Sequence, residues 1–383
     1  MVEALYIHWP FCLAKCPYCD FNSHVRQKTD TFAWREALLA DLGHEAKRAG
    51  IAPLRSIFFG GGTPSLMPPS LVGDLLRETE TVFGFSDEIE ITLEANPSSV
   101  EAANFAALAD AGVNRVSLGV QSLREDALRF LGRLHSVDEA LRAVELAQRH
   151  FGRVSLDLIY ARPGQTAEAW EKELGEALAL GTGHLSLYQL TIEPQTRFAT
   201  DVRRRLFTPL ADDPAAELFS LTREITAQAG LPAYEISNHA RPGEESRHNL
   251  TYWRYRDYLG IGPGAHGRRG GVATMRVRKP ENYLARLAEI GHALAEERAL
   301  GDAEQASEAL LVGLRLAEGV DLGELQARFG FGADQLIDDR RFTLHRDNGL
   351  LWRKGERIGV TDAGMPLLDA LLGEIVCDGL VAA

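Results

Sequence analysis

Three cysteines near the start of the chain have a spacing suited to metal ligation. Cys12, Cys16 and Cys19 directly follow the first strand-like run, and the only other cysteine is Cys377. Thiols gathered in this way, in a chain with so few cysteines, are typical of metal binding in a reducing compartment and not of a disulfide framework. Three thiolates suit either an iron–sulfur cluster or a zinc ion.

The spacing favours the cluster over zinc. A structural zinc site normally has a fourth ligand at short spacing, and His24 is the only nearby candidate after the cysteines. A four-iron cluster held by three thiolates leaves one iron open for an exchangeable ligand, which would explain the absence of a fourth cysteine. We therefore expect Cys12, Cys16 and Cys19 to hold a [4Fe–4S] cluster.

The rest of the chain has the pattern of repeated strand–helix units. Short β-branched and aromatic runs alternate with amphipathic segments, which is typical of βαβ units and predicts an α/β parallel barrel or part-barrel. The expected strands are 4–8, 55–59, 88–94, 115–119, 153–159 and 184–190, and the expected helices are 31–49, 68–83, 99–111, 136–150 and 166–180.

Glycines and polar residues stand where these strands end. The second strand runs into Gly60-Gly61-Gly62-Thr63, the third into Glu94, the fourth into Gln121, and Asp157 lies near the end of the fifth. In parallel barrels the carboxyl ends of the strands converge on one mouth, where the chemistry takes place. We expect these residues to lie together beside the cysteine loop, although Glu94 and Asp157 could also be buried cap or ion-pair residues.

Composition excludes several classes of partner. The formal net charge is −13, so the surface has no overall attraction for nucleic acid or anionic lipid. No run approaches 18 apolar residues, and the first strand begins almost at Met1, which leaves no room for a signal peptide. We expect a cytoplasmic protein without a transmembrane segment, whose contact with a membrane would be peripheral and through a protein partner.

The last part of the chain indicates a second, small domain. Helical patterns at 303–316 and 321–328 precede two short strand-like runs joined by Lys354-Gly355, as in the wing of a winged-helix module. Residues 301–383 hold 8 Lys and Arg against 15 Asp and Glu, a balance of −7 that argues against DNA binding. A structural or protein-contacting module is expected.

The cysteine loop resembles that of the radical-SAM superfamily, whose CxxxCxxC motif it matches residue for residue. The resemblance implies a partial (βα)6 TIM-like barrel in which S-adenosylmethionine chelates the open iron and is cleaved to a 5′-deoxyadenosyl radical. It assigns to the S-adenosylmethionine site Tyr6, Gly61, Gly62, Thr63, Glu94, Gln121, Arg133 and Asp157. The glycines would let the backbone approach the methionyl group, and Arg133 could instead pair with a surface acid.

Further motifs resemble one branch of the superfamily, which contains the oxygen-independent coproporphyrinogen III oxidases (HemN) and the heme chaperones (HemW). The oxidases carry a further cysteine where this chain has Phe21, and they have an amino-terminal extension before the cluster loop, which here starts at residue 12. The segment from His248 to Trp253 matches the HNxxYW motif of the chaperones. The resemblance implies a barrel over 1–235, an HNxxYW-containing extension over 236–300 and a winged-helix-like HemN C-terminal domain over 301–383.

The HNxxYW motif is a candidate heme site. A neutral imidazole of His248 could ligate heme iron while Tyr252 and Trp253 offer flat faces to the porphyrin. Arg247, Arg254 and Arg256 could pair with the propionates. The hexapeptide alone is also explained by ordinary core packing, and His266 is an alternative ligand. We expect His8 to orient the cysteine loop.

Three functions remain open at this point. The first is a heme carrier that uses its cluster and S-adenosylmethionine to deliver heme to an acceptor hemoprotein. The second is radical decarboxylation of coproporphyrinogen propionates. The third is a radical-SAM enzyme with an unrelated substrate, in which the HNxxYW segment is structural.

Overall fold

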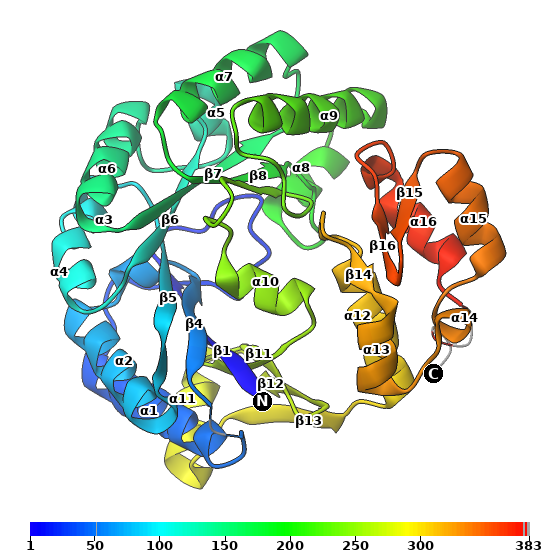
Figure 1. The fold of residues 1–383 in the computed structure, drawn as a ribbon. Helices are drawn as coiled ribbons and strands as arrows, with labels where there is room; N and C mark the ends of the chain where they lie inside the picture. The colour runs from blue at the N-terminus through cyan, green and yellow to red at the C-terminus, as the bar shows by residue number, and fades with distance from the viewer. Residues whose placement is uncertain (51, 378–379, 381–383) are drawn as a thin grey trace.

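The computed structural model describes residues 1–50, 52–377 and 380 (Figure 1). Six parallel strands, joined through helices, form the arc of an incomplete barrel. They are β1 (Val2–Trp9), β4 (Leu54–Gly61), β5 (Phe85–Ala95), β6 (Arg115–Gln121), β7 (Arg153–Tyr160) and β8 (His184–Gln189). The predicted α/β part-barrel is confirmed, and each strand lies within three residues of its expected bounds.

Helices cover the outside of this arc (Figure 1). The larger ones are α1 (Thr31–Ala46), α2 (Pro69–Phe83), α6 (Val137–His150), α7 (Ala167–Ala179) and α9 (Asp212–Gln228), with α3 (Ser99–Ala102), α4 (Phe105–Asp110), α5 (Glu125–Phe130) and α8 (Arg197–Arg203) between them. Their starts follow capping rules: Ser136 and Glu139 form a capping box at α6, and Thr166 caps α7. The main apolar core lies between these helices and the strands.

The sheet extends beyond the six predicted strands. At one edge β10 (Asp257–Ile261) pairs in parallel with β1, and the antiparallel strands β11 (His266–Arg269), β12 (Val272–Arg276) and β13 (Leu294–Ala299) follow. Helix α11 (Pro280–Ile290) connects β12 to β13, and β9 (Asn238–Ala240) pairs with β8 at the other edge. The carboxyl end of β10 therefore lies at the same mouth as the cysteine loop.

Helix α10 (Arg247–Trp253) lies inside the arc of strands (Figure 1). Ser246 caps its start, and the buried carboxylate of Glu90 on β5 accepts hydrogen bonds from the backbone N–H groups of Arg247 and His248. Glu90 lies four residues before Glu94 along β5, so α10 contacts the strands on the side away from the mouth.

A separate domain follows, with its own apolar core. Its helices are α12 (Asp302–Gly313), α13 (Leu322–Phe329), α14 (Ala333–Leu336), α15 (Asp339–Asp347) and α16 (Leu368–Ile375). Its sheet has β16 (Arg357–Val360) between β14 (Val320–Asp321) and β15 (Leu351–Lys354), so the predicted wing is confirmed. Within the described part of the chain, no helix combines the length and the apolar character needed to cross a membrane.

Candidate cluster and S-adenosylmethionine site

The cysteine loop is closed at its base by two short paired strands. Directly after β1, the strand β2 (Phe11–Cys12) pairs in parallel with β3 (His24–Val25), and the loop between them carries Cys16 and Cys19. The backbone N–H of Cys19 donates to the carbonyl of Cys16 at 3.2 Å, which forms the turn between these two thiols. The loop thus holds its cysteines over the mouth of the barrel.

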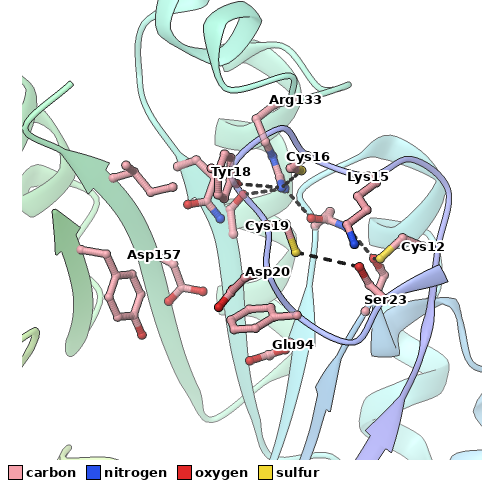
Figure 2. A pocket seen from close by; sticks show the side chains of 18 of the residues that line it. Cys12, Lys15, Cys16, Tyr18, Cys19, Asp20, Ser23, Glu94, Arg133 and Asp157 are labelled. Atoms are coloured by element: carbon pink, nitrogen blue, oxygen red, sulfur yellow. Dashed lines mark hydrogen bonds between the residues drawn. The ribbon is translucent and has the colours of Figure 1, made fainter. Parts of the chain in front are cut away.

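Each of the three thiols has a polar neighbour. The hydroxyl of Thr63 donates to the sulfur of Cys12 at 3.4 Å, and the guanidinium of Arg133 donates to that of Cys16 at 3.3 Å. The sulfur of Cys19 lies 3.9 Å from the hydroxyl of Ser23 (Figure 2). Donors aimed at sulfur favour thiolate ligands, whereas burial raises the pKa of the free Cys12 and Cys19 thiols.

The thiols line a cavity and do not gather around one point. Among the residues described by the structure, no three His, Cys, Asp or Glu side chains lie close enough to share a single metal ion. The cavity has a volume of about 380 Å³, and all three cysteines contribute to its wall. The donor set of three soft sulfurs suits iron.

Seven of the eight predicted S-adenosylmethionine residues line this same cavity. They are Gly61, Gly62, Thr63, Glu94, Gln121, Arg133 and Asp157. Figure 2 shows Glu94 on β5 and Asp157 on β7 below the cysteine loop, and Arg133 above it. The carboxyl ends of β4 to β7 bring six of these residues together, as expected for parallel strands, and Arg133 comes from the loop between α5 and α6.

The two carboxyl groups lie in the wall of the cavity, and both side chains are half-buried. Asp157 accepts a hydrogen bond from the hydroxyl of Ser117 at 2.8 Å, and Glu94 accepts one from the backbone N–H of Gly61 at 3.2 Å. Burial, and next the charge of Asp157, raise the pKa of Glu94 to about 8. Burial also raises the pKa of Asp157. Such a pair can accept hydrogen bonds from hydroxyl groups or from an ammonium group of a ligand.

Arg133 connects the cysteine loop to the strand ends. Besides Cys16, its guanidinium donates to the backbone carbonyl of Gly119 at 3.1 Å and to the side-chain carbonyl of Asn96. The amide of Asn96 in turn donates to the hydroxyl of Thr63 at 3.1 Å. Asn96 was not among the predicted site residues, although its position two residues after Glu94 at a strand end was a usable signal.

The glycines have a structural reason beyond ligand approach. A Cβ on Gly61 would lie 2.5 Å from the imidazole of His8, and one on Gly62 would lie 2.7 Å from the carbonyl oxygen of Phe11. Gly61 also has a φ of +113°, which disfavours any other residue. The absence of a side chain at Gly61 and Gly62 lets His8 and the start of the cysteine loop pack against the end of β4. A larger residue at either glycine would displace the loop.

Tyr6 is the one predicted residue that does not line the cluster cavity. Its hydroxyl lies 2.9 Å from Nδ1 of His8, and it borders two neighbouring cavities instead. Nε2 of His8 lies 2.9 Å from the backbone carbonyl of Asn22 at the end of the cysteine loop. The expectation that His8 orients this loop is confirmed.

His248 lies inside the barrel, away from the surface. Its side chain is 1% exposed, its Nδ1 lies 3.0 Å from the hydroxyl of Ser56, and its Nε2 lies 2.6 Å from that of Tyr252. Burial lowers the pKa of His248 to about 3. Both ring nitrogens are therefore engaged, and ligation of heme iron would require one of these contacts to break.

The remaining HNxxYW residues do not form one porphyrin-binding face. His248 and Tyr252 line a cavity inside the barrel, whereas Trp253 lines a different cavity beside the carboxyl-terminal domain. The three arginines suggested for propionates are paired with carboxylates: Arg247 with Glu88, Arg254 with Glu318 and Arg256 with Glu324. The last two of these pairs join the segment that follows α10 to the carboxyl-terminal domain, so Arg254 and Arg256 have a tethering role.

Two family models and several known proteins match this chain. The Radical SAM superfamily model matches residues 6–176, and the HemN C-terminal domain model matches residues 300–367. "Heme chaperone HemW" of Escherichia coli is 38% identical, covering 96% of this chain and 97% of the relative. The protein of that name from Haemophilus influenzae is 37% identical, covering 96% of both.

Two further similarities extend the comparison. "Radical S-adenosyl methionine domain-containing protein 1, mitochondrial" of Danio rerio is 36% identical, covering 98% of this chain and 88% of the relative. The solved structure of coproporphyrinogen III oxidase (HemN) from Escherichia coli matches with a TM-score of 0.81 at 23% identity, covering 97% of this chain and 89% of that one. At this identity the structural match shows a shared fold.

Proposed function

Because the chain belongs to the radical-SAM family that contains the heme chaperones named HemW, we propose that it binds heme and transfers it to an acceptor hemoprotein. The observation that carries this proposal is the identity of 37% with the Haemophilus influenzae chaperone, spread over 96% of both chains. An identity that spans barrel, extension and carboxyl-terminal domain supports a shared task for the whole chain. The acceptor is a protein that lacks its heme until delivery.

The cofactors follow from the same family membership. Cys12, Cys16 and Cys19 would hold a [4Fe–4S] cluster, for which the hydrogen bonds from Thr63 and Arg133 to sulfur are suited. When bound, the cluster supplies the electron that cleaves S-adenosylmethionine. Glu94 and Asp157 would accept hydrogen bonds from the ligand, and Gln121 would complete the wall of its cavity.

The cysteine loop would also shield this ligand from water. The cysteine loop covers the mouth, with His8 and Asn22 holding its far end to the barrel. Arg133 fixes the opposite side of the loop through its bonds to Cys16 and Gly119. The loop is thus fastened at two places on different strands, and the ligand would lie beneath it.

Two measurements on the cluster-loaded protein test the function. Hemin titration followed by difference absorbance should show a saturable complex, and anaerobic incubation with S-adenosylmethionine, reductant and coproporphyrinogen III should give no protoporphyrinogen IX. Catalytic formation of protoporphyrinogen IX would instead assign the protein as an oxidase. Absence of a saturable hemin complex would refute the carrier function.

Transfer is tested separately from binding. The heme-loaded protein is mixed with an excess of apomyoglobin, a general heme acceptor, and the myoglobin spectrum is followed. A carrier should release its heme to this acceptor within minutes. Retention of heme over hours would show a permanently bound group and would overturn the transfer part of the proposal.

A further inference from the structure

A second opening lies beside the cluster cavity, between the carboxyl ends of β1 and β10. It is a groove of about 350 Å³, within the range of sites that hold small organic ligands. Its wall includes Phe21, Tyr258, His266 and Arg278. Phe21, Gly61 and Glu94 line both this groove and the cluster cavity, so the two spaces share a wall.

The groove offers a metal ligand that the barrel interior does not. His266 is exposed at the start of β11, and its imidazole makes no hydrogen bond to any residue that the structure describes. By contrast, His248 has both ring nitrogens engaged and is 1% exposed. A histidine that ligates the iron of an incoming heme needs a nitrogen that can reach it, and His266 meets this requirement.

The groove also offers contacts for the two other parts of a heme. The side chain of Phe21 is 61% exposed, although phenylalanine is usually buried, and it presents a flat apolar face at the groove. Arg278 is exposed, and within the described chain its guanidinium has no carboxylate partner. This distinguishes it from Arg254 and Arg256, which are already paired. A free guanidinium suits a propionate.

The side chain of Asn22 links the segments that carry these three residues. The side-chain amide of Asn22, next to Phe21, donates to the carbonyl of Pro263 at 2.8 Å and to the carbonyl of Arg278 at 2.9 Å. Gly264 packs against this amide, since a Cβ there would lie 2.6 Å from the Asn22 nitrogen. Asn22 thus fastens the segment of Phe21 to the loop before His266 and to the strand end that carries Arg278.

We propose that heme binds in this groove, with His266 as an axial ligand of the iron, Phe21 against the porphyrin face and Arg278 on a propionate. This inference rests on the proposed function, and it names the site for the cargo. A groove that is open to solvent leaves part of the porphyrin accessible, which suits a carrier that must release it. The heme would lie against the wall of the cluster cavity.

The test compares single variants of the cluster-loaded protein in hemin titrations. His266→Ala should weaken hemin binding at least tenfold and shift the Soret band, and added imidazole should restore the wild-type band by replacing the lost ligand. His150→Ala, an exposed histidine on the outside of the barrel, is the matched control and should bind as wild type does. His248→Ala should keep the wild-type Soret band.

The propionate contact is tested with a modified ligand. Arg278→Gln should bind hemin several-fold more weakly than wild type, while both proteins should bind hemin dimethyl ester equally, because the ester has no carboxylate to pair. Equal loss for hemin and its ester would remove Arg278 from the site.

The outcomes separate this inference from the function on which it rests. If wild type forms no saturable hemin complex, the proposed function fails. If wild type binds hemin and His266→Ala keeps its affinity and its Soret band, the function stands and the site assigned here is wrong. Loss of the Soret band in His248→Ala alone would place the ligand inside the barrel.

Discussion

His8 on β1 and Asn22 at the end of the cysteine loop are joined by a hydrogen bond of 2.9 Å, from Nε2 of the imidazole to the backbone carbonyl. Because a carbonyl oxygen only accepts, this contact places the proton of His8 on Nε2 and leaves Nδ1 to accept from the hydroxyl of Tyr6. Burial lowers the pKa of His8 to about 4, in keeping with a neutral ring. The chain Tyr6–His8–Asn22 fixes where the cysteine loop returns to the barrel.

Replacing Asn22 by Asp should loosen the cysteine loop. The side chain keeps its size but loses both donated hydrogen bonds, to Pro263 and Arg278, and each is worth about 1 kcal/mol. Hydrogen exchange of residues 11–25 should become faster in the variant. Asp20→Asn, in the same loop at an exposed side chain, is the control and should leave exchange unchanged. Wild-type exchange in Asn22→Asp would contradict the fastening role.

Thr63→Val should lower the reduction potential of the bound cluster. The variant keeps the shape of the side chain and removes the hydroxyl that donates to Cys12. Hydrogen bonds to cluster sulfurs stabilise the reduced state, and a bond worth ~1 kcal/mol corresponds to roughly 40 mV for one electron. Thr63→Ser should restore the potential, measured by redox titration with EPR detection. Equal potentials in wild type and Thr63→Val would exclude this contact as a tuning element.

Without ligand, the Glu94→Gln variant should gain stability relative to wild type as the pH rises. The folded-state pKa of Glu94 is raised from 4.5 to about 8, so folding favours the protonated form. The unfolded chain releases this proton above pH 4.5, and wild type therefore loses stability relative to the variant by about 1.4 kcal/mol per pH unit between pH 4.5 and 8. Urea unfolding at several pH values measures the difference. A difference independent of pH would show that Glu94 ionises freely.

His248→Asn should give the opposite pH dependence. The folded-state pKa is lowered from 6.5 to about 3, so the native protein holds this ring neutral. As pH falls from 6.5 towards 3, only the unfolded chain takes up the proton, and wild type loses about 1.4 kcal/mol per pH unit relative to the variant. Urea unfolding at several pH values measures this difference in stability between wild type and His248→Asn. The corresponding difference for Glu94→Gln should change with pH in the opposite direction. A flat difference below pH 6.5 would mean that His248 is accessible to protons in the native state.

The amino-acid sequence alone predicted the part-barrel and the gathering of polar strand-end residues beside the cysteine loop. Strand–helix alternation is local, so the bounds of β4 to β8 followed from periodicity. Parallel strands must end at one mouth, and this rule gathers residues as distant in sequence as Gly61 and Asp157 into one cavity. The spacing of three cysteines within one loop needed no knowledge of the tertiary structure.

Only the tertiary structure decided which side each histidine and arginine faces. His248 meets Ser56 from 192 positions away, and the amide of Asn22 meets Arg278 across 256, contacts that no local pattern encodes. The seven-residue helix α10 is too short for its periodicity to reveal a buried face, and the barrel interior it meets is itself polar. The sequence therefore left open whether the motif binds heme or packs in the core, and the exposed His266 was distinguished from the enclosed His248 only once packing fixed what surrounds each ring.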